Sequence, residues 1–220
     1  MSQQDLSTQI QAICAEQIND FALQIDPTIP AILTAHIAAS DATYSGSERT
    51  ALIGQDPTLL TSTLANPSFD YVALGHIHKY QDLHKGSMPP VVYSGSLERI
   101  DFGEEHETKG FIIGSIDIED GDPSKRTTHF EFIPVAARSF VTVEVEINQQ
   151  TSPTDQVVAA IERKDISNAV VRVLYTMNAE DGKSIDLERI RTALSDAFYV
   201  ASIQPRIRPT DRPRRTGITE

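Results

Sequence analysis

The sequence contains no tryptophan, one cysteine and only 6% aromatic residues. Because Cys14 stands alone, it cannot form a disulfide bond within the chain, which suits a reducing compartment. No apolar run approaches the roughly 20 residues that a membrane-spanning helix needs. The N-terminus also lacks the basic and apolar regions of a signal peptide. We therefore expect a cytoplasmic protein with no membrane partner.

Positive charge is scarce as well. The formal net charge is −12, with 19 Lys and Arg against 31 Asp and Glu. Several of the few cations gather in the stretch 205–220, so the rest of the chain is more acidic still: Arg206, Arg208, Arg212, Arg214 and Arg215. Such a charge argues against nucleic-acid binding by phosphate neutralisation alone. If the chain acts on phosphodiesters, bound metal ions or another polypeptide must supply positive charge.

The stretch Tyr71–His78 (YVALGHIH) is the most informative part of the chain. Its short apolar run predicts a buried strand, and Gly75 is expected to permit a sharp turn. Residues two apart point to the same side of an extended backbone, so His76 and His78 should project together from the strand end. Ligands collect at this edge of open α/β sheets, and imidazole is a common metal ligand. A structural pair of hydrogen-bonded histidines, or a surface turn, is the alternative.

A second apolar stretch, 31–37, also predicts a buried strand and carries His36 near its C-terminal end. A lone histidine in an apolar strand is usually a core residue, and only the repeated pattern of strand and histidine makes His36 a candidate. The remaining three histidines have no strand-end setting, and we expect them on the surface or in loops: His84, His106 and His129.

The other elements expected before residue 135 are two helices, a strand with a loop after it, and a hairpin. Apolar residues in 5–23 form a ragged helical stripe, and Asp56-Pro57 opens a short helix that reaches about residue 65. The strand 91–93 leads into the polar loop 94–104. The expected hairpin joins two apolar stretches, Gly110–Ile118 and Thr128–Pro134.

The pattern changes near residue 136. Residues 139–203 predict the order strand, helix, strand, helix, strand, with Ser152 and Ser184 as helix caps. We therefore expect an α/β protein with one domain at 1–135, a small two-layer α/β domain at 136–204 and a basic linker or tail rich in Pro and Arg at 205–220.

Three motifs occur in the order found in the SbcD family of DNA repair nucleases, which the chain resembles over most of 28–205. They are Ala35-His36-Ile37, the stretch Phe69–Gln81 and the stretch Val92–Glu104, and Lys109-Gly110-Phe111 also matches. The resemblance implies part of a four-layer, calcineurin-like metallophosphoesterase sandwich followed by a capping domain that contacts DNA. It implies Mn-dependent DNA exonuclease and endonuclease activity in repair and recombination, with a coiled-coil ABC ATPase, SbcC, as partner.

The resemblance also assigns a metal site. It implies that His36, His76 and His78 are ligands of two Mn²⁺ ions, the first two binding one ion and His78 the other. The family's remaining ligands have no counterpart here: the Asp-x-His after its first strand, a bridging Asp and the Asn of Gly-Asn-His-Asp. We therefore expect the distal half of such a nuclease, and a separate chain that carries the N-terminal half is a candidate partner.

Three imidazoles without a carboxylate ligand predict weak or single-metal binding that favours Zn or Ni over Mn. We accordingly expect that this chain alone does not hydrolyse DNA, because two close cations need a bridging anion between them. Two other readings remain open. One is a fragment of another calcineurin-like phosphoesterase, such as a nucleotide phosphatase. The other is a non-catalytic remnant that binds DNA or a protein partner.

Overall fold

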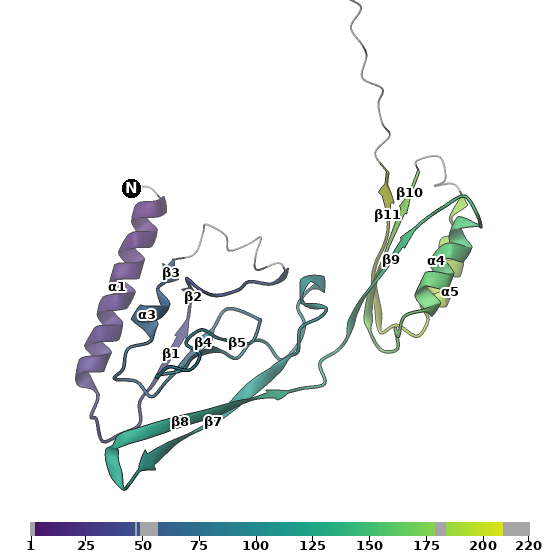
Figure 1. Ribbon diagram of the computed structural model, residues 1–220. Helices are drawn as coiled ribbons and strands as arrows, with labels where there is room; N and C mark the ends of the chain where they lie inside the picture. The colour runs from purple at the N-terminus through teal and green to yellow at the C-terminus, as the bar shows by residue number, and fades with distance from the viewer. Residues whose placement is uncertain (1–2, 47, 49–56, 179–183, 209–220) are drawn as a thin grey trace, which may run out of the picture. The chain divides into compact units, whose positions relative to one another are not determined.

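The computed structural model describes residues 3–46, 48, 57–178 and 184–208. The chain divides into two compact units, Met1–Ala137 and Arg138–Glu220. Each contains helices and strands, so the mixed α/β character predicted from the sequence is confirmed (Figure 1). Among the described residues, no helix combines the length and the apolar character needed to cross a membrane.

The first unit is built on a four-stranded sheet of order β1-β4-β6-β5. β1 (Ile32–His36), β4 (Tyr71–Gly75) and β6 (Val91–Tyr93) run parallel, and β5 (Gln81–Asp82) pairs antiparallel with β6. The three parallel strands are short, and β4 and β6 consist mostly of apolar residues, as is usual for strands covered on both faces. His36 pairs with Gly75, so β1 and β4 end at the same edge of the sheet.

Helix α1 (Gln3–Gln24) contributes to the core on one face of this sheet. The predicted apolar stripe on α1 is wrong: of its members only Ile18 is buried, whereas Leu6, Ile13 and Phe21 are between 44% and 59% exposed. The residues that face the core are Cys14, Ile18 and Ala22. They follow one another at a spacing of four and share the side of the helix that is centred on Ile18, whereas Leu6 and Ile13 lie close together on another side.

The region after residue 56 differs from the short helix expected there. Thr58–Leu59 forms β3, which pairs parallel with β2 (Ala38–Ala39), and helix α3 is confined to Thr61–Leu64. Asp56, the expected cap, lies outside the described residues. Residues 58–59 thus pair with β2, which is distant in the sequence, although the local Asp-Pro pattern favours the start of a helix there.

The predicted hairpin is present as β7 (Gly110–Glu119) and β8 (Asp122–Pro134). Its aromatic side chains contact the sheet region: the rings of Tyr71 and Phe130 meet edge to face with centroids 5.7 Å apart, and Tyr80 stacks on Phe132 at 4.2 Å. At the far end of β8, Arg126 Nε lies 2.8 Å from Asp70 Oδ1, at the start of β4. The hairpin therefore covers part of the sheet face opposite α1.

The second unit is a two-layer α/β structure. Its elements follow the predicted order: β9 (Phe140–Glu146), α4 (Pro153–Glu162), β10 (Val170–Met177), α5 (Leu187–Ala193) and β11 (Tyr199–Ile207). The sheet order is β11-β10-β9 with all strands parallel, and both helices pack on one face of it (Figure 1). Apolar residues from all five elements form one core.

Details of the second unit correct three expectations. Asp186, not Ser184, caps α5, because its carboxylate accepts hydrogen bonds from the N–H groups of Glu188 and Arg189. Ser152 does occupy the cap position of α4 but makes no side-chain hydrogen bond there. β11 continues to Ile207, so the stretch assigned to a tail begins inside a strand. The remainder of that stretch, 209–220, lies outside the described residues.

Candidate functional site

The ends of β1 and β4 bring two of the predicted histidines together. His36 is the last residue of β1, and His76 directly follows the last residue of β4. Their rings meet edge to face, with centroids 5.1 Å apart. A cavity of about 460 Å³ at this edge is lined by His36 together with Gly75 and Ser94. The parallel register of the two strands is therefore what creates this pair of imidazoles.

His76 has a backbone conformation that a residue with a Cβ atom rarely adopts. Its φ is 99°, in the left-handed half of the Ramachandran plot. The sequence led us to expect the special conformation at Gly75, whose φ is not positive. Such a conformation costs on the order of 1–3 kcal/mol and persists where the surroundings enforce it, often at functional sites. The surroundings of His76 therefore enforce a conformation that the residue itself does not favour.

His78 lies among carboxylates. Its Nδ1 is 2.9 Å from Glu104 Oε1 and 3.3 Å from Glu48 Oε1. The Glu104 side chain is completely buried, whereas 32% of the His78 side chain remains exposed. Because the two ring nitrogens lie on opposite sides of the imidazole, Nε2 faces away from Glu104.

The backbone of His78 is held as firmly as its ring. Its N–H donates to Glu48 Oε1 at 2.6 Å, and its carbonyl oxygen accepts from Ser96 N at 3.1 Å and from Lys109 Nζ at 3.1 Å. Gly95 packs directly against this carbonyl. A Cβ there would lie 2.8 Å from the oxygen, and the φ of Gly95 is 77°, so only glycine fits both restraints.

A buried ion network supports Glu104. Lys109 Nζ lies 2.7 Å from Glu104 Oε2 and 2.9 Å from Glu107 Oε2, and 1% of the Lys109 side chain is exposed. Burial acts to raise the pKa of Glu104, but hydrogen bonds from Lys109, His78 and the N–H of Ile100 outweigh it and hold the pKa below its usual value. Glu104 is therefore an ionised carboxylate at neutral pH.

Local backbone geometry delivers Glu104 to this place. It ends a short 3₁₀ helix, η1 (Phe102–Glu104), whose first turn is capped by Asp101 through a hydrogen bond from Gly103 N. A Cβ on Gly103 would overlap the Cα of Gly46, so the loop that carries Glu104 and the segment that carries Glu48 approach backbone to backbone. This close approach places both carboxylates next to His78.

The three predicted histidines do not gather around one point. Within the described residues, no group of three or more His, Cys, Asp or Glu side chains is arranged to hold a metal ion. The expected convergence of His36, His76 and His78 is therefore not met: the first two form a pair, and His78 joins the carboxylates. The reason is the φ of 99° at His76, because residues two apart share a side only when the backbone between them is extended.

The remaining histidines have ordinary settings. His106 and His129 are exposed, as expected. His84 belongs to the one Asp-x-His triplet of the sequence, Asp82-Leu83-His84. That triplet forms a local turn, in which Asp82 Oδ1 accepts from His84 N and His84 Nδ1 donates to the carbonyl oxygen of Pro89 at 2.7 Å. Because both side chains are used within this turn, the triplet is not a counterpart of the family's metal-binding motif.

The sequence did not single out the buried charges Glu48, Glu104 and Lys109. Glu104 and Lys109 stand inside stretches that resemble the SbcD motifs, but nothing in their spacing indicated burial. Polar residues in loops are normally exposed, and only the long-range contact between the 46–48 and 101–109 segments encloses these three.

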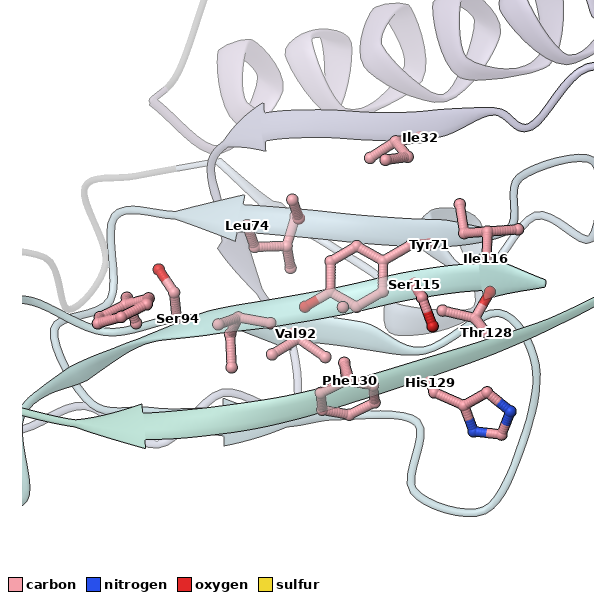
Figure 2. Close-up of a pocket in the computed structure, with 14 residues that line it drawn as sticks. Ile32, Tyr71, Leu74, Val92, Ser94, Ser115, Ile116, Thr128, His129 and Phe130 are labelled. Carbon is pink, nitrogen blue, oxygen red and sulfur yellow. The ribbon is translucent and has the colours of Figure 1, made fainter.

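An apolar groove of the first unit lies elsewhere. It measures about 500 Å³ and runs between the sheet face opposite α1 and the β7–β8 hairpin (Figure 2). Ile32, Tyr71 and Val92 line it from the sheet, and Ile116 and Phe130 line it from the hairpin. Burial raises the pKa of Tyr71 to about 12. None of the three candidate histidines lines this groove, so the candidate chemistry is at the sheet edge and not in this groove.

No protein-family model matches the sequence. The ligands that the site could bind follow from its donor atoms. The site has a pair of imidazoles at one position and, nearby in sequence, a third imidazole whose Nδ1 faces a buried carboxylate. Imidazole nitrogens bind Zn²⁺, Mn²⁺, Fe²⁺ and Ni²⁺, and a carboxylate that accepts from the far nitrogen of a ligand histidine is the usual support of such ligands.

Proposed function

We propose that this chain forms the distal part of an SbcD-type, metal-dependent DNA nuclease, with His36 and His76 as ligands of one ion and His78 as a ligand of a second. The observation that carries the proposal is the pairing of the His36 and His76 rings at 5.1 Å while His78 lies apart among carboxylates. The SbcD pattern likewise assigns the first two histidines to one ion and the third to the other. The strained φ of His76 is a second support.

The donor set fits such a site in part. Two imidazoles suit one divalent transition-metal ion and a third suits another, but each ion would need further ligands, including an anionic one. Two ions bound in this way would polarise a phosphodiester and lower the pKa of an attacking water. The residues of this chain would bind and orient the ions, and the missing ligands must come from another polypeptide segment.

The β1 edge of the sheet is consistent with a second polypeptide that completes the site. β1 lies at the edge of the sheet, and its Ile32 is 55% exposed beside the apolar groove. An open strand with exposed apolar neighbours is suited to pair with a further strand. In the proposal this strand belongs to an N-terminal half that carries the remaining metal ligands. DNA and an SbcC-type ATPase are the other partners that the proposal includes, and the second unit serves as the cap.

Complementation tests the proposal. The purified chain is mixed with a polypeptide that supplies the family's Asp-x-His, bridging Asp and Gly-Asn-His-Asp motifs, and Mn²⁺-dependent cleavage of labelled duplex DNA is measured. We expect no cleavage by either part alone and clear cleavage by the mixture. His78→Ala should abolish cleavage, whereas His129→Ala, an exposed histidine on β8, should not.

The same assay separates the alternatives. If the mixture releases phosphate from mononucleotides and leaves duplex DNA intact, the chain belongs to a nucleotide phosphatase and the nuclease proposal fails. If DNA is bound but no phosphoester is hydrolysed with any divalent ion, the non-catalytic reading is correct. Cleavage by this chain alone, removed by His76→Ala, would show that the account of the missing ligands is wrong.

A further inference from the structure

The two carboxylate oxygens of Glu104 have different partners. Oε2 lies 2.7 Å from Lys109 Nζ and accepts from the N–H of Ile100 at 3.1 Å. Oε1 lies 2.9 Å from Nδ1 of His78. Lysine and a backbone N–H are donors only, so they fix which side of the carboxylate faces the lysine and which faces the histidine.

This arrangement determines the tautomer of His78. An ionised carboxylate only accepts hydrogen bonds, so Nδ1 must carry the proton. Oε1 of Glu48, 3.3 Å from the same nitrogen, is a second acceptor on that side. In a neutral ring protonated on Nδ1, Nε2 holds the free lone pair. Histidine in water prefers the opposite tautomer, with the proton on Nε2, so the protein selects the less common form.

A purely structural role explains poorly why Glu104 contacts the ring of His78. A buried histidine needs hydrogen-bond partners, but 32% of the His78 side chain is exposed, so water could satisfy it. The charge of Glu104 is already balanced by Lys109 through the other oxygen. Burying a carboxylate completely in order to fix a half-exposed ring is useful if the ring must present one particular nitrogen.

We propose that Glu104 is a positioning residue that holds His78 as the Nδ1–H tautomer, so that Nε2 is presented to a divalent metal ion. The metal part of this inference rests on the proposed function, whereas the tautomer does not. Glu104 touches no reacting atom in this scheme and acts only through His78. Lys109 and Ile100 act one step further out, because they orient the carboxylate.

The substitution Glu104→Gln makes a sharp test. Its amide has one acceptor and one donor, and the two donors at the Oε2 position require the amide oxygen there. The NH₂ group then faces Nδ1 of His78, which must become an acceptor, and the proton moves to Nε2. Glu107→Gln is the matched control: Glu107 also contacts Lys109, at 2.9 Å, but it makes no contact with the His78 ring.

The readout is two-bond ¹H–¹⁵N correlation NMR of ¹⁵N-histidine-labelled protein without metal at pH 8.5, above the ordinary titration range of histidine. The His78 signals are identified by their loss in His78→Gln. We expect the Nδ1–H tautomer in the wild type and in Glu107→Gln, and the Nε2–H tautomer in Glu104→Gln. A proton on Nε2 of His78 in the wild type overturns the inference, whatever the behaviour of Glu104→Gln.

Titration with Zn²⁺ alone then tests the metal part. In the wild type the Nε2 signal of His78 should shift on binding, and Glu104→Gln should need about 10–100 times more Zn²⁺ for the same shift. If Zn²⁺ shifts His36 and His76 but never His78, the inference is overturned, whereas the proposed role of His36 and His76 as ligands of one ion survives. If Zn²⁺ shifts none of the three, the proposed metal site is overturned, and the tautomer alone decides the role of Glu104.

Discussion

The two units of this protein differ most in what they bury. The first unit encloses three charged side chains, Glu48, Glu104 and Lys109, whereas the only buried polar residue among the described part of the second unit is Thr154. They differ in backbone strain as well. The first unit holds His76 at a φ of 99°, whereas the second unit uses Asn168, a residue type that tolerates its φ of 55°.

They also differ in what they leave exposed. Among the described residues, most of the exposed large apolar side chains belong to the first unit. Eight of them occur on α1, at the β1 edge and on the hairpin, and the others lie in loops or turns: Leu6, Ile13, Phe21, Leu23, Ile32, Phe111, Ile113 and Ile118, and then Ile29, Leu60, Met88, Leu97 and Ile100. The second unit has fewer: Leu187, Phe198, Tyr199 and Ile207. The second unit is thus a largely closed apolar core. The described part of the first unit combines a cluster of buried charges with an edge strand that has exposed apolar residues beside it, and the proposed function places the metal ligands and the partner contact there.

The substitution Lys109→Met should cause the largest loss of stability that is confined to one unit. It leaves Glu104 and Glu107 without their cation in a buried site, which typically costs about 3–5 kcal/mol. We expect lost hydrogen-exchange protection in β4 and retained protection in β10, measured by mass spectrometry. Lys125→Met is the control, because Lys125 is 65% exposed and its nearest carboxylate oxygen is 4.0 Å away. Equal loss of protection in β10 would show that the two units unfold together.

The converse change is Ile161→Ala in α4. Ile161 is 1% exposed in the core of the second unit, and such a truncation costs about 2–5 kcal/mol. Protection should fall in β10 and stay unchanged in β4. The urea midpoint of the second unit should fall with it. Protection lost in β4 would contradict the description of two separate cores.

The contrast also explains what the sequence could predict. The second unit follows local rules, since alternating apolar residues and capped helices produced the right order of elements. In the first unit the strands 71–75 and 91–93 and the hairpin were predicted for the same reason. The α1 stripe failed because the apolar side that carries Leu6 and Ile13 is not the side that faces the core. The spacing of apolar residues does not show which side of a helix the core will meet.

The site could be predicted only as far as its strand ends. The histidines at positions 36 and 76 were expected to meet, because the ends of parallel strands share an edge. The separate place of His78 depends on a φ at position 76 that no pattern of residue types reveals. The Glu104–Lys109 network depends on segments far apart in the chain, and a glutamate in a loop carries no local sign of burial.

An alkaline titration gives a further, smaller contrast. Burial raises the pKa of Tyr71 to about 12 and also raises the pKa of Tyr93, both in the first unit, whereas in the second unit it raises the pKa of Tyr175. A raised pKa means that stability is complete below the unfolded value near 10 and is lost as pH rises toward 12. We expect the urea midpoint of the first unit to fall between pH 9.5 and 11.5. Tyr71→Phe should lessen the fall, and an unchanged fall in that variant would contradict the assignment.

The smallest effect tests the strain at His76. At an ordinary position, glycine is less stable than alanine by about 0.5–1 kcal/mol, because glycine loses more backbone entropy on folding. At a φ of 99° the order should reverse, since glycine adopts this conformation freely and alanine does not. We expect His76→Gly to be more stable than His76→Ala by about 1 kcal/mol.

The matched pair is His36→Gly and His36→Ala, because His36 lies in the regular strand β1 and should show the ordinary order. Both pairs remove a ring of the same imidazole contact, so the lost packing is similar and the difference within each pair isolates the backbone. Urea unfolding of the four variants measures it. If the alanine variant is more stable than the glycine variant at both positions, the backbone of His76 is not strained, and one of the two supports for its role at the metal site is lost. If the order of stability reverses only at position 76, the protein holds this histidine in a conformation that the backbone of a non-glycine residue disfavours. A turn with a purely structural role could carry glycine at this position and avoid that cost in stability.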